Sequence, residues 1–251
     1  MKVAQNTIEL IRMMVRSKED ISVSEAARQI GVNRSTASRL LATLRDGGLF
    51  DQNPDTQKYR PGMLALQLGM RSRSSFNVLE WITAQAETVV QAIGHTVCLG
   101  VLDGADVMIV ATKRRATPIY LTLDVGTCIR AHASAMGKVI LAQLDDEAVR
   151  ALLPEPLDKM AEMTRTSHHA LLEDLALIRK TGYAISHNEL ANGISSYAVC
   201  TRLKDETPMA IGVAYLSNEN HSDEYQIVSS LLDFKKRIDR ELLLVDKPVR
   251  R

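Results

Sequence analysis

The stretch VSEAARQIGVNRSTASRLLATL, residues 23–44, fits two short helices joined by a tight turn. The first helix is expected over residues 24–30 with Ser24 as its N-cap, and Gly31 can take the positive φ that closes a helix. Asn33 then caps a second helix. Its apolar residues recur at helical spacing and are expected to pack inward: Ala37, Leu40, Leu41 and Leu44.

The outer face of that second helix is rich in hydrogen-bonding groups. It carries two guanidinium groups and four hydroxyls: Arg34, Ser35, Thr36, Ser38, Arg39 and Thr43. Such groups suit phosphate oxygens and base edges in the major groove of DNA. A merely solvated polar face is the alternative, but Ala27 and Gly31 are small where two crossing helices need close approach. We therefore expect a helix that reads DNA.

The flanking segments complete a winged helix-turn-helix. Upstream, a supporting helix is expected to turn three apolar residues inward: Ile8, Ile11 and Val15. Downstream, GLFDQNPDTQKYRPG, residues 48–62, is typical of strand, turn and strand. Alternation places Lys58 and Arg60 on the face opposite Tyr59, which predicts a basic wing.

Length and charge indicate two domains. A chain of 251 residues exceeds the usual size of one domain. Residues 1–75 contain 12 Lys or Arg against 7 Asp or Glu, a net charge of +5, and the remainder contains 19 against 23, a net charge of −4. A positive first part suits attraction to phosphate. The expected domains are a winged helix-turn-helix over 1–62, a linker helix over 63–75 and a second domain over 76–251.

The sequence gives no sign of export or of membrane insertion. It shows neither a basic and then apolar leader nor a run of about 18 apolar residues, so we expect a cytoplasmic protein with no membrane partner. Cys98, Cys128 and Cys200 lack CxxC spacing, which disfavours a disulfide framework or a zinc ribbon. A redox-sensing thiol stays open, because it requires exposure and a lowered pKa.

From residue 76 onward, helical and strand patterns alternate. Helices are expected over 76–93, from near Ser134, and over 146–153, 168–181 and 223–244; strands are expected in a hairpin over 95–113 and over 118–126, 197–203 and 209–217. This order predicts an α+β domain with an antiparallel central sheet. A linker helix with exposed apolar residues favours a dimer or, equally, a contact with the second domain.

Motifs of catalysis are lacking. The chain has no GxGxxG or GxxxxGK[ST] loop, residues 193–197 depart from the GxSxG elbow, and the histidines form no metal-ligand pair. We therefore expect no catalytic residue, no metal and no cofactor. Two alternatives stay open: an enzyme acting on a small metabolite with the winged helix as a docking module, and an architectural DNA binder whose second domain only oligomerises.

A small-residue junction offers a place for a ligand. In GTCIRAHASAMGKVIL, residues 126–141, the small side chains are Ala131, Ala133, Ser134 and Ala135. Free backbone N–H groups at a helix start can receive an anionic or carbonyl group. Close packing of a helix on a sheet is the simpler explanation of these residues alone.

Over essentially its full length the chain resembles the IclR-type transcriptional regulators of bacteria. The resemblance is carried by HASAMGKVILA, residues 132–142, and by TGYAISHNELANGISSYAV, residues 181–199, with Glu189 and Gly193 in place. It implies a first domain that binds double-stranded operator DNA and a GAF-like second domain that binds a metabolite effector. It also implies homodimers that pair into tetramers, and we slightly prefer a repressor to an activator.

The resemblance also assigns residues to each site. The DNA contacts are Arg34, Ser35, Thr36, Ser38, Arg39, Lys58 and Arg60, and the effector contacts are Leu121, Ala135, Met136, His187, Ser196, Ala214 and Leu216. Several of these positions are less polar than the family's pattern, which favours an effector with apolar surface and a carboxylate or hydroxyl end. His187 either selects an anion when protonated or is satisfied by backbone at a strand edge.

Overall fold

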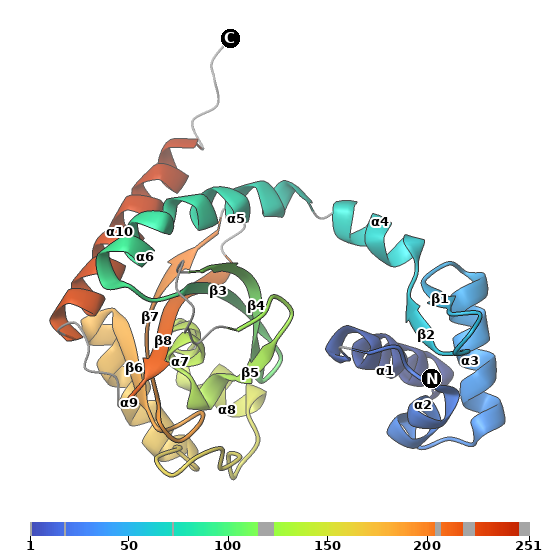
Figure 1. The fold of residues 1–251 in the computed structure, drawn as a ribbon. Helices are drawn as coiled ribbons and strands as arrows, with labels where there is room; N and C mark the ends of the chain where they lie inside the picture. Colours follow the sequence, from blue (N-terminus) through green and yellow to red (C-terminus); the bar gives the residue numbers. More distant parts are fainter. Residues whose placement is uncertain are drawn as a thin grey trace. The chain divides into compact units, whose positions relative to one another are not determined.

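The computed structural model describes residues 2–17, 19–71, 73–114, 123–203, 207–217 and 224–245. The chain forms two compact units, Met1–Asn77 and Val78–Arg251. Figure 1 shows the elements of each unit in sequence colours. Within the described ranges, no helix combines the length and the apolar character needed to cross a bilayer.

The first unit is a winged helix-turn-helix. Its elements are α1 (Lys2–Arg16), α2 (Val23–Ile30), α3 (Arg34–Asp46), β1 (Phe50–Gln52), β2 (Tyr59–Pro61) and α4 (Met63–Arg71). The predicted cap of α2 at Ser24 is wrong by two residues. Ser22 caps the helix, because its hydroxyl accepts the Glu25 N–H while the Glu25 carboxylate accepts the Ser22 N–H over 2.8 Å.

The turn between α2 and α3 follows the prediction. Gly31 closes α2 in the left-handed region with φ of 65°. Asn33 caps α3, since its Oδ1 accepts the Thr36 N–H over 2.8 Å. Ala37, Leu41 and Leu44 of α3 are buried against the other helices of this unit.

The predicted inward face of α1 is wrong. Leu10 and Met14 are buried, whereas Ile8 and Val15 are 50% and 62% exposed and Ile11 is half-buried. Two apolar stripes run along this helix, and both have helical spacing. Spacing alone does not say which stripe meets the core, and the contacts with α2 and α3 select the Leu10 stripe.

The wing is an antiparallel pair of short strands. Asp51 lies opposite Arg60, and Gln52 lies opposite Tyr59. Tyr59 is buried, and two backbone hydrogen bonds of 2.8 Å tie it to Ile21. Tyr59 is buried and Arg60, the next residue of β2, is exposed, as expected from strand alternation. Lys58 lies just before the strand and is half-buried.

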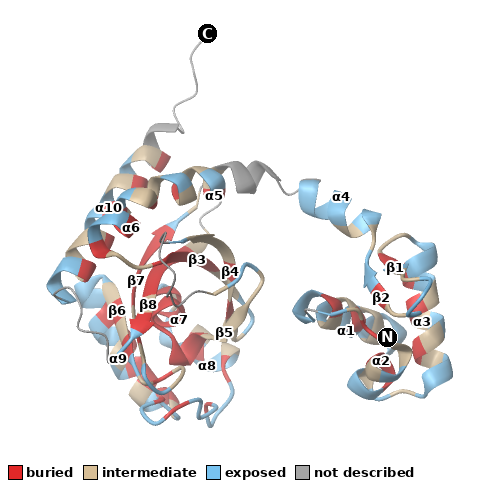
Figure 2. Cartoon of the chain, in the orientation of Figure 1, coloured by how far each residue is buried: buried red, intermediate tan, exposed pale blue. Residues whose placement is uncertain are grey.

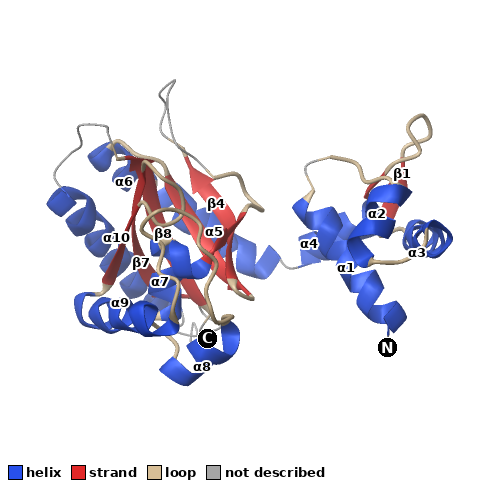
Figure 3. Ribbon diagram, turned by 90° about the horizontal axis from the view of Figure 1, so that it is seen from below, coloured by secondary structure: helices blue, strands red, loops and turns tan. Residues whose placement is uncertain are grey.

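The second unit is a six-stranded antiparallel sheet with helices on both faces, as Figure 3 shows. The strand order is β5-β4-β3-β8-β7-β6. The strands are β3 (Val97–Asp103), β4 (Asp106–Lys113), β5 (Cys128–Arg130), β6 (Tyr183–His187), β7 (Ile194–Arg202) and β8 (Pro208–Leu216). The helices are α5 (Arg73–Gln85), α6 (Glu87–Ile93), the 3-10 turn η1 (Ala131–Ala133), α7 (Ala135–Leu141), α8 (Asp146–Leu152), α9 (His168–Thr181) and α10 (Glu224–Val245).

Each face of this sheet has its own core, because side chains alternate along every strand. On one face, α7, α8 and α9 bury residues such as Val139 and Leu175 against Ala198. On the other, α5, α6 and α10 bury residues such as Ile82 and Leu231 against Val199. Figure 2 shows that buried residues are concentrated along the strands and on the helices that pack against them.

Three expectations for this unit need correction. The single helix expected over 76–93 is two helices, α5 and α6, that meet at Ala86. Residues 118–122 lie outside the described residues, and residues 123–126 form no strand, so the third strand is β5. β6 was not predicted, because the segment is only five residues long, although the Asn192-Gly193 pair after it is a turn signal.

Candidate nucleic-acid interface and ligand pocket

The outer face of α3 presents two unpaired guanidinium groups. Arg34 and Arg39 are exposed, and neither forms an ion pair in the part of the chain that the structure describes. The hydroxyls beside them are partly engaged: Ser35 donates to the Asn33 side chain and Thr43 donates to the Arg39 carbonyl oxygen. Thr36 and Ser38 are half-buried. The two cations are therefore available to an anionic partner.

The two basic residues of the wing differ in their surroundings. Arg60 forms an ion pair of 2.8 Å with Asp51, its neighbour across the hairpin. The hydrogen bond from Arg60 lowers the pKa of the Asp51 carboxyl. Lys58 forms no ion pair with any described residue. Much of the positive charge of Arg60 is thus neutralised within the wing, whereas that of Lys58 is not.

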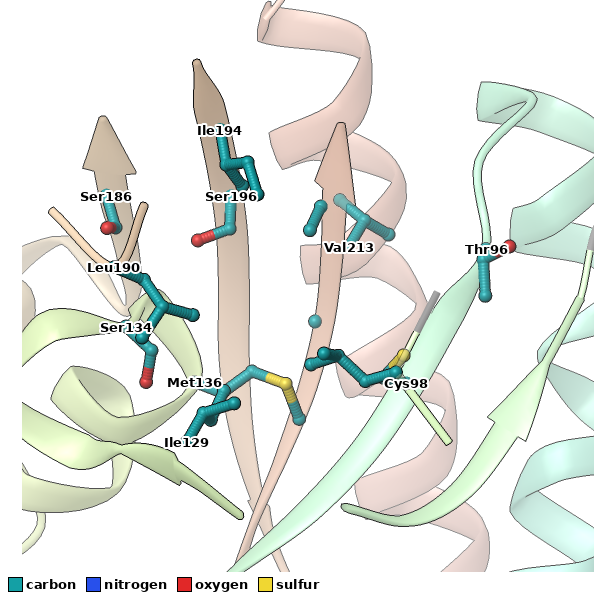
Figure 4. A pocket seen from close by; sticks show the side chains of 13 residues that line it. Thr96, Cys98, Ile129, Ser134, Met136, Ser186, Leu190, Ile194, Ser196 and Val213 are labelled. Carbon is teal, nitrogen blue, oxygen red and sulfur yellow. The ribbon is translucent and has the colours of Figure 1, made fainter. Parts of the chain in front are cut away.

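A pocket opens in the second unit between α7 and the concave face of the sheet. It holds about 620 Å³ not occupied by protein atoms, its open mouth included. Figure 4 shows side chains from β3, β5, α7, β6, β7 and β8 around it. Its lining residues are Thr96, Cys98, Leu123, Ile129, Ser134, Met136, Ser186, Leu190, Ile194, Ser196, Gly212, Val213 and Ala214.

Of the seven expected effector residues, three line this pocket: Met136, Ser196 and Ala214. Three others do not: Ala135 is buried in the core behind it, and His187 and Leu216 are exposed. Leu121 lies outside the described residues. The other ten lining residues were not assigned from the sequence to this site, although Ser134 was noted at the small-residue junction.

Strand alternation explains the place of His187. Ser186 faces the pocket and donates a hydrogen bond to the Ala133 carbonyl oxygen over 3.1 Å. The next side chain therefore points to the other face of β6. There the His187 Nδ1 lies 2.9 Å from the Ser195 hydroxyl, and the imidazole meets Tyr197 edge-on. A strand phase read from buried Ala184 would have predicted Ser186 instead.

A buried ionic cluster lies behind α7. The Lys138 ammonium is 1% exposed and lies 2.8 Å from Asp174 and 2.5 Å from Glu189. Arg165 also contacts Asp174, over 3.0 Å. Burial raises the pKa of Asp174, but hydrogen bonds from Arg165 and Lys138 lower it by more, so its net shift is downward. At Glu189 burial outweighs the effect of the Lys138 ammonium and raises the pKa of the carboxyl. The cluster therefore brings two cations, Lys138 and Arg165, against two carboxyl groups.

Models of known families match both units. The IclR helix-turn-helix domain matches residues 3–54, and the bacterial transcriptional regulator IclR C-terminal domain matches residues 70–240. The chain belongs to the IclR family. Members are transcriptional regulators and not enzymes, so the IclR-type helix-turn-helix of this chain is a DNA-binding module.

Curated relatives and solved structures agree with this membership. The transcriptional repressor IclR of Escherichia coli (strain K12) is 30% identical over 206 residues, 81% of this chain and 75% of that protein. The transcriptional regulator XynR of the same organism is 26% identical over 196 residues, 78% of each chain.

Among solved structures, an IclR-type regulator from Silicibacter sp. TM1040 has a TM-score of 0.85 at 22% identity, with 96% of each chain covered. An IclR homolog from Microbacterium hydrocarbonoxydans, complexed with 4-hydroxybenzoate, has a TM-score of 0.80 at 20% identity, with 96% of this chain and 99% of that chain covered. At these identities the likeness shows a shared fold.

Proposed function

We propose that this IclR-family protein is a metabolite-responsive repressor. Its DNA contacts are Arg34, Ser35, Thr36, Ser38, Arg39, Lys58 and Arg60, and its effector site is the pocket above Met136. The unpaired Arg34 and Arg39 on the exposed face of α3 carry the proposal for DNA. A groove-reading helix needs such free donors for guanine edges and phosphates. Arg60 contributes least to DNA binding, because its guanidinium group already forms an ion pair with Asp51.

Repression and effector binding are supported by relatives. The names of two relatives, the transcriptional repressor IclR and the acetate operon repressor of Salmonella typhimurium, describe repressors. The Microbacterium neighbour carries a small aromatic acid. Here an effector acts by binding two states of the protein with different affinity, a coupling of typically about 1 to 3 kcal/mol. The protein works as a homodimer on two half-sites.

Sequence selection from a random duplex pool tests the DNA part of this proposal. The full-length protein should enrich one motif with two related half-sites, and added effector should change its affinity for that motif. Retention of all duplexes alike at low salt, with nothing enriched, would instead indicate an architectural binder.

A further inference from the structure

We infer that the pocket takes an uncharged ligand: an apolar body with a hydroxyl or carbonyl group that pairs with Ser196. This inference rests on the proposed function, because it names the chemical class of the effector. The sequence favoured an effector with either a carboxylate or a hydroxyl end, and the inference selects the uncharged hydroxyl over the carboxylate. Three features of the pocket carry it, namely its lining, its nearest charges and the free hydroxyl of Ser196.

The lining offers no charge to balance an anion. Among the described residues that line the pocket, every side chain is aliphatic, a thioether, a thiol or a hydroxyl. Burial raises the pKa of the Cys98 thiol, so this group stays protonated and neutral. A carboxylate placed there loses its hydration and gains no cation from the described lining residues, so only backbone N–H groups at the start of α7 could compensate it, which is unfavourable in an apolar site.

The buried cation on α7 is already paired. Lys138 follows Met136 by two residues on α7, but its ammonium points into the ionic cluster with Asp174 and Glu189. Arg165 completes that cluster on Asp174. Both cations of the cluster are thus engaged with carboxyl groups, and neither lines the pocket.

Two hydroxyls of the described pocket lining have no hydrogen-bond partner among the described residues: Thr96, whose oxygen is buried, and Ser196. Ser186 donates to the Ala133 carbonyl oxygen, and Ser134 accepts the Gly137 N–H over 3.1 Å. Figure 4 shows the Ser196 hydroxyl directed to the side of the pocket where Ser134 and Ser186 lie. It can therefore donate to a ligand carbonyl or accept from a ligand hydroxyl.

The apolar body of the ligand packs against the thioether side chain of Met136, which forms the floor of the pocket. The Met136 side chain lies close over Gly100 and Gly212, where a β-carbon would come within 2.8 Å and 2.5 Å of its atoms. Cys98, Ile129 and Val213 continue this apolar surface. A methionine floor adapts to different shapes, so it selects by polarity more than by outline.

Three probes that share a benzene ring separate the chemical classes of ligand. Toluene carries a methyl group alone, p-cresol carries a methyl and a hydroxyl group, and 4-hydroxybenzoate carries a carboxylate in place of the methyl group of p-cresol. For this experiment the full chain is labelled with 13C-methyl methionine, and the NMR signal that disappears in Met136→Leu is assigned to Met136. Titration with p-cresol should shift that signal at a concentration about tenfold or more below that needed for 4-hydroxybenzoate. Equal or tighter binding of 4-hydroxybenzoate, or no Met136 shift with any probe at millimolar concentration, overturns the inference.

Variants at two adjacent serines test the hydrogen bond. Ser196→Ala should weaken p-cresol about fivefold and leave toluene unchanged. Ser195→Ala is the matched control, since its hydroxyl contacts His187 and Ser217 on the other face of β7. Equal losses for both probes, or for both variants, contradict a role for Ser196.

The outcome for DNA separates this inference from the proposed function. If p-cresol binds the pocket but no pocket ligand changes affinity for the selected DNA motif, the ligand class stands and the effector role fails. If 4-hydroxybenzoate binds more tightly and changes DNA affinity, the effector role stands and the neutral class fails.

Discussion

The ammonium of Lys138 lies 2.5 Å from the carboxylate of Glu189, and this contact joins α7 to the loop that follows β6. Met136 on α7 and Leu190 on that loop both line the pocket. The wall and the floor of the pocket are therefore linked through a buried ion pair. Thr164 supports the same loop, because its hydroxyl donates to the Glu189 carbonyl oxygen over 2.6 Å.

Removal of this cation should destabilise the second unit strongly. Lys138→Met leaves the Glu189 carboxylate buried without its partner, and breaking a buried pair from one side lowers the free energy of unfolding by about 3 to 5 kcal/mol. Urea denaturation measures the loss. Lys159→Met is the control, because Lys159 is exposed and forms no ion pair with a described residue. Equal stability of the two variants contradicts the account.

Acid should weaken the cluster through Asp174. The folded state lowers the pKa of this carboxyl, so its contribution to stability is fully present above the unfolded pKa of about 3.9 and is lost as pH falls through the lower folded pKa. The difference in unfolding free energy between wild type and Asp174→Asn should therefore shrink below about pH 4. The wing variant Asp55→Asn should follow the wild-type curve, and a constant difference for Asp174→Asn would count against the assignment.

Two basic residues of the first unit should act differently on DNA. Arg39→Ala should lose about 1 to 3 kcal/mol on the selected motif and relax its sequence preference, because a groove contact reads bases. Lys58→Ala should weaken all duplexes alike and reduce the slope of log affinity against log salt by about 1. Fluorescence anisotropy across a salt series measures both effects, and identical behaviour of the two variants argues against this division.

The floor of the pocket should be sensitive to a single methyl group. A β-carbon at Gly212 would lie 2.5 Å from the Met136 Cγ, so Gly212→Ala must displace this side chain. Overpacking of this kind lowers the free energy of unfolding by about 1 to 3 kcal/mol, and we expect it to abolish the Met136 shift with p-cresol. Gly69→Ala on α4 is the control, since a β-carbon there meets no atom within 4 Å. Unchanged p-cresol binding by Gly212→Ala would contradict the role of Met136 as the floor of the pocket.

The helix-turn-helix was predictable because its signals are local. Gly31 and Asn33 each act on the backbone within a few residues, and the structure shows both in the expected roles. The face of α1 was not predictable, since two stripes of similar apolar character run along it. Only the packing of Leu10 and Met14 against α2 and α3 separates them.

The pocket was harder to predict because it depends on strand phase and on distant strands. The family resemblance placed His187 at the pocket, but a shift of one residue exchanges the two faces of a strand, and in β6 it is Ser186 that lines the pocket. Cys98 and Gly212 reach the pocket only because β3 and β8 are neighbours in the sheet. Nothing in either segment alone signals that pairing.

We propose that the exposed face of α3 reads DNA sequence. Selection from a random duplex pool with wild type and with Arg34→Ala/Arg39→Ala, each at equal folded concentration, tests it most directly. We expect wild type to enrich one motif and the double variant to retain only weak, unselective binding. Enrichment of the same motif to the same extent by both proteins would contradict it.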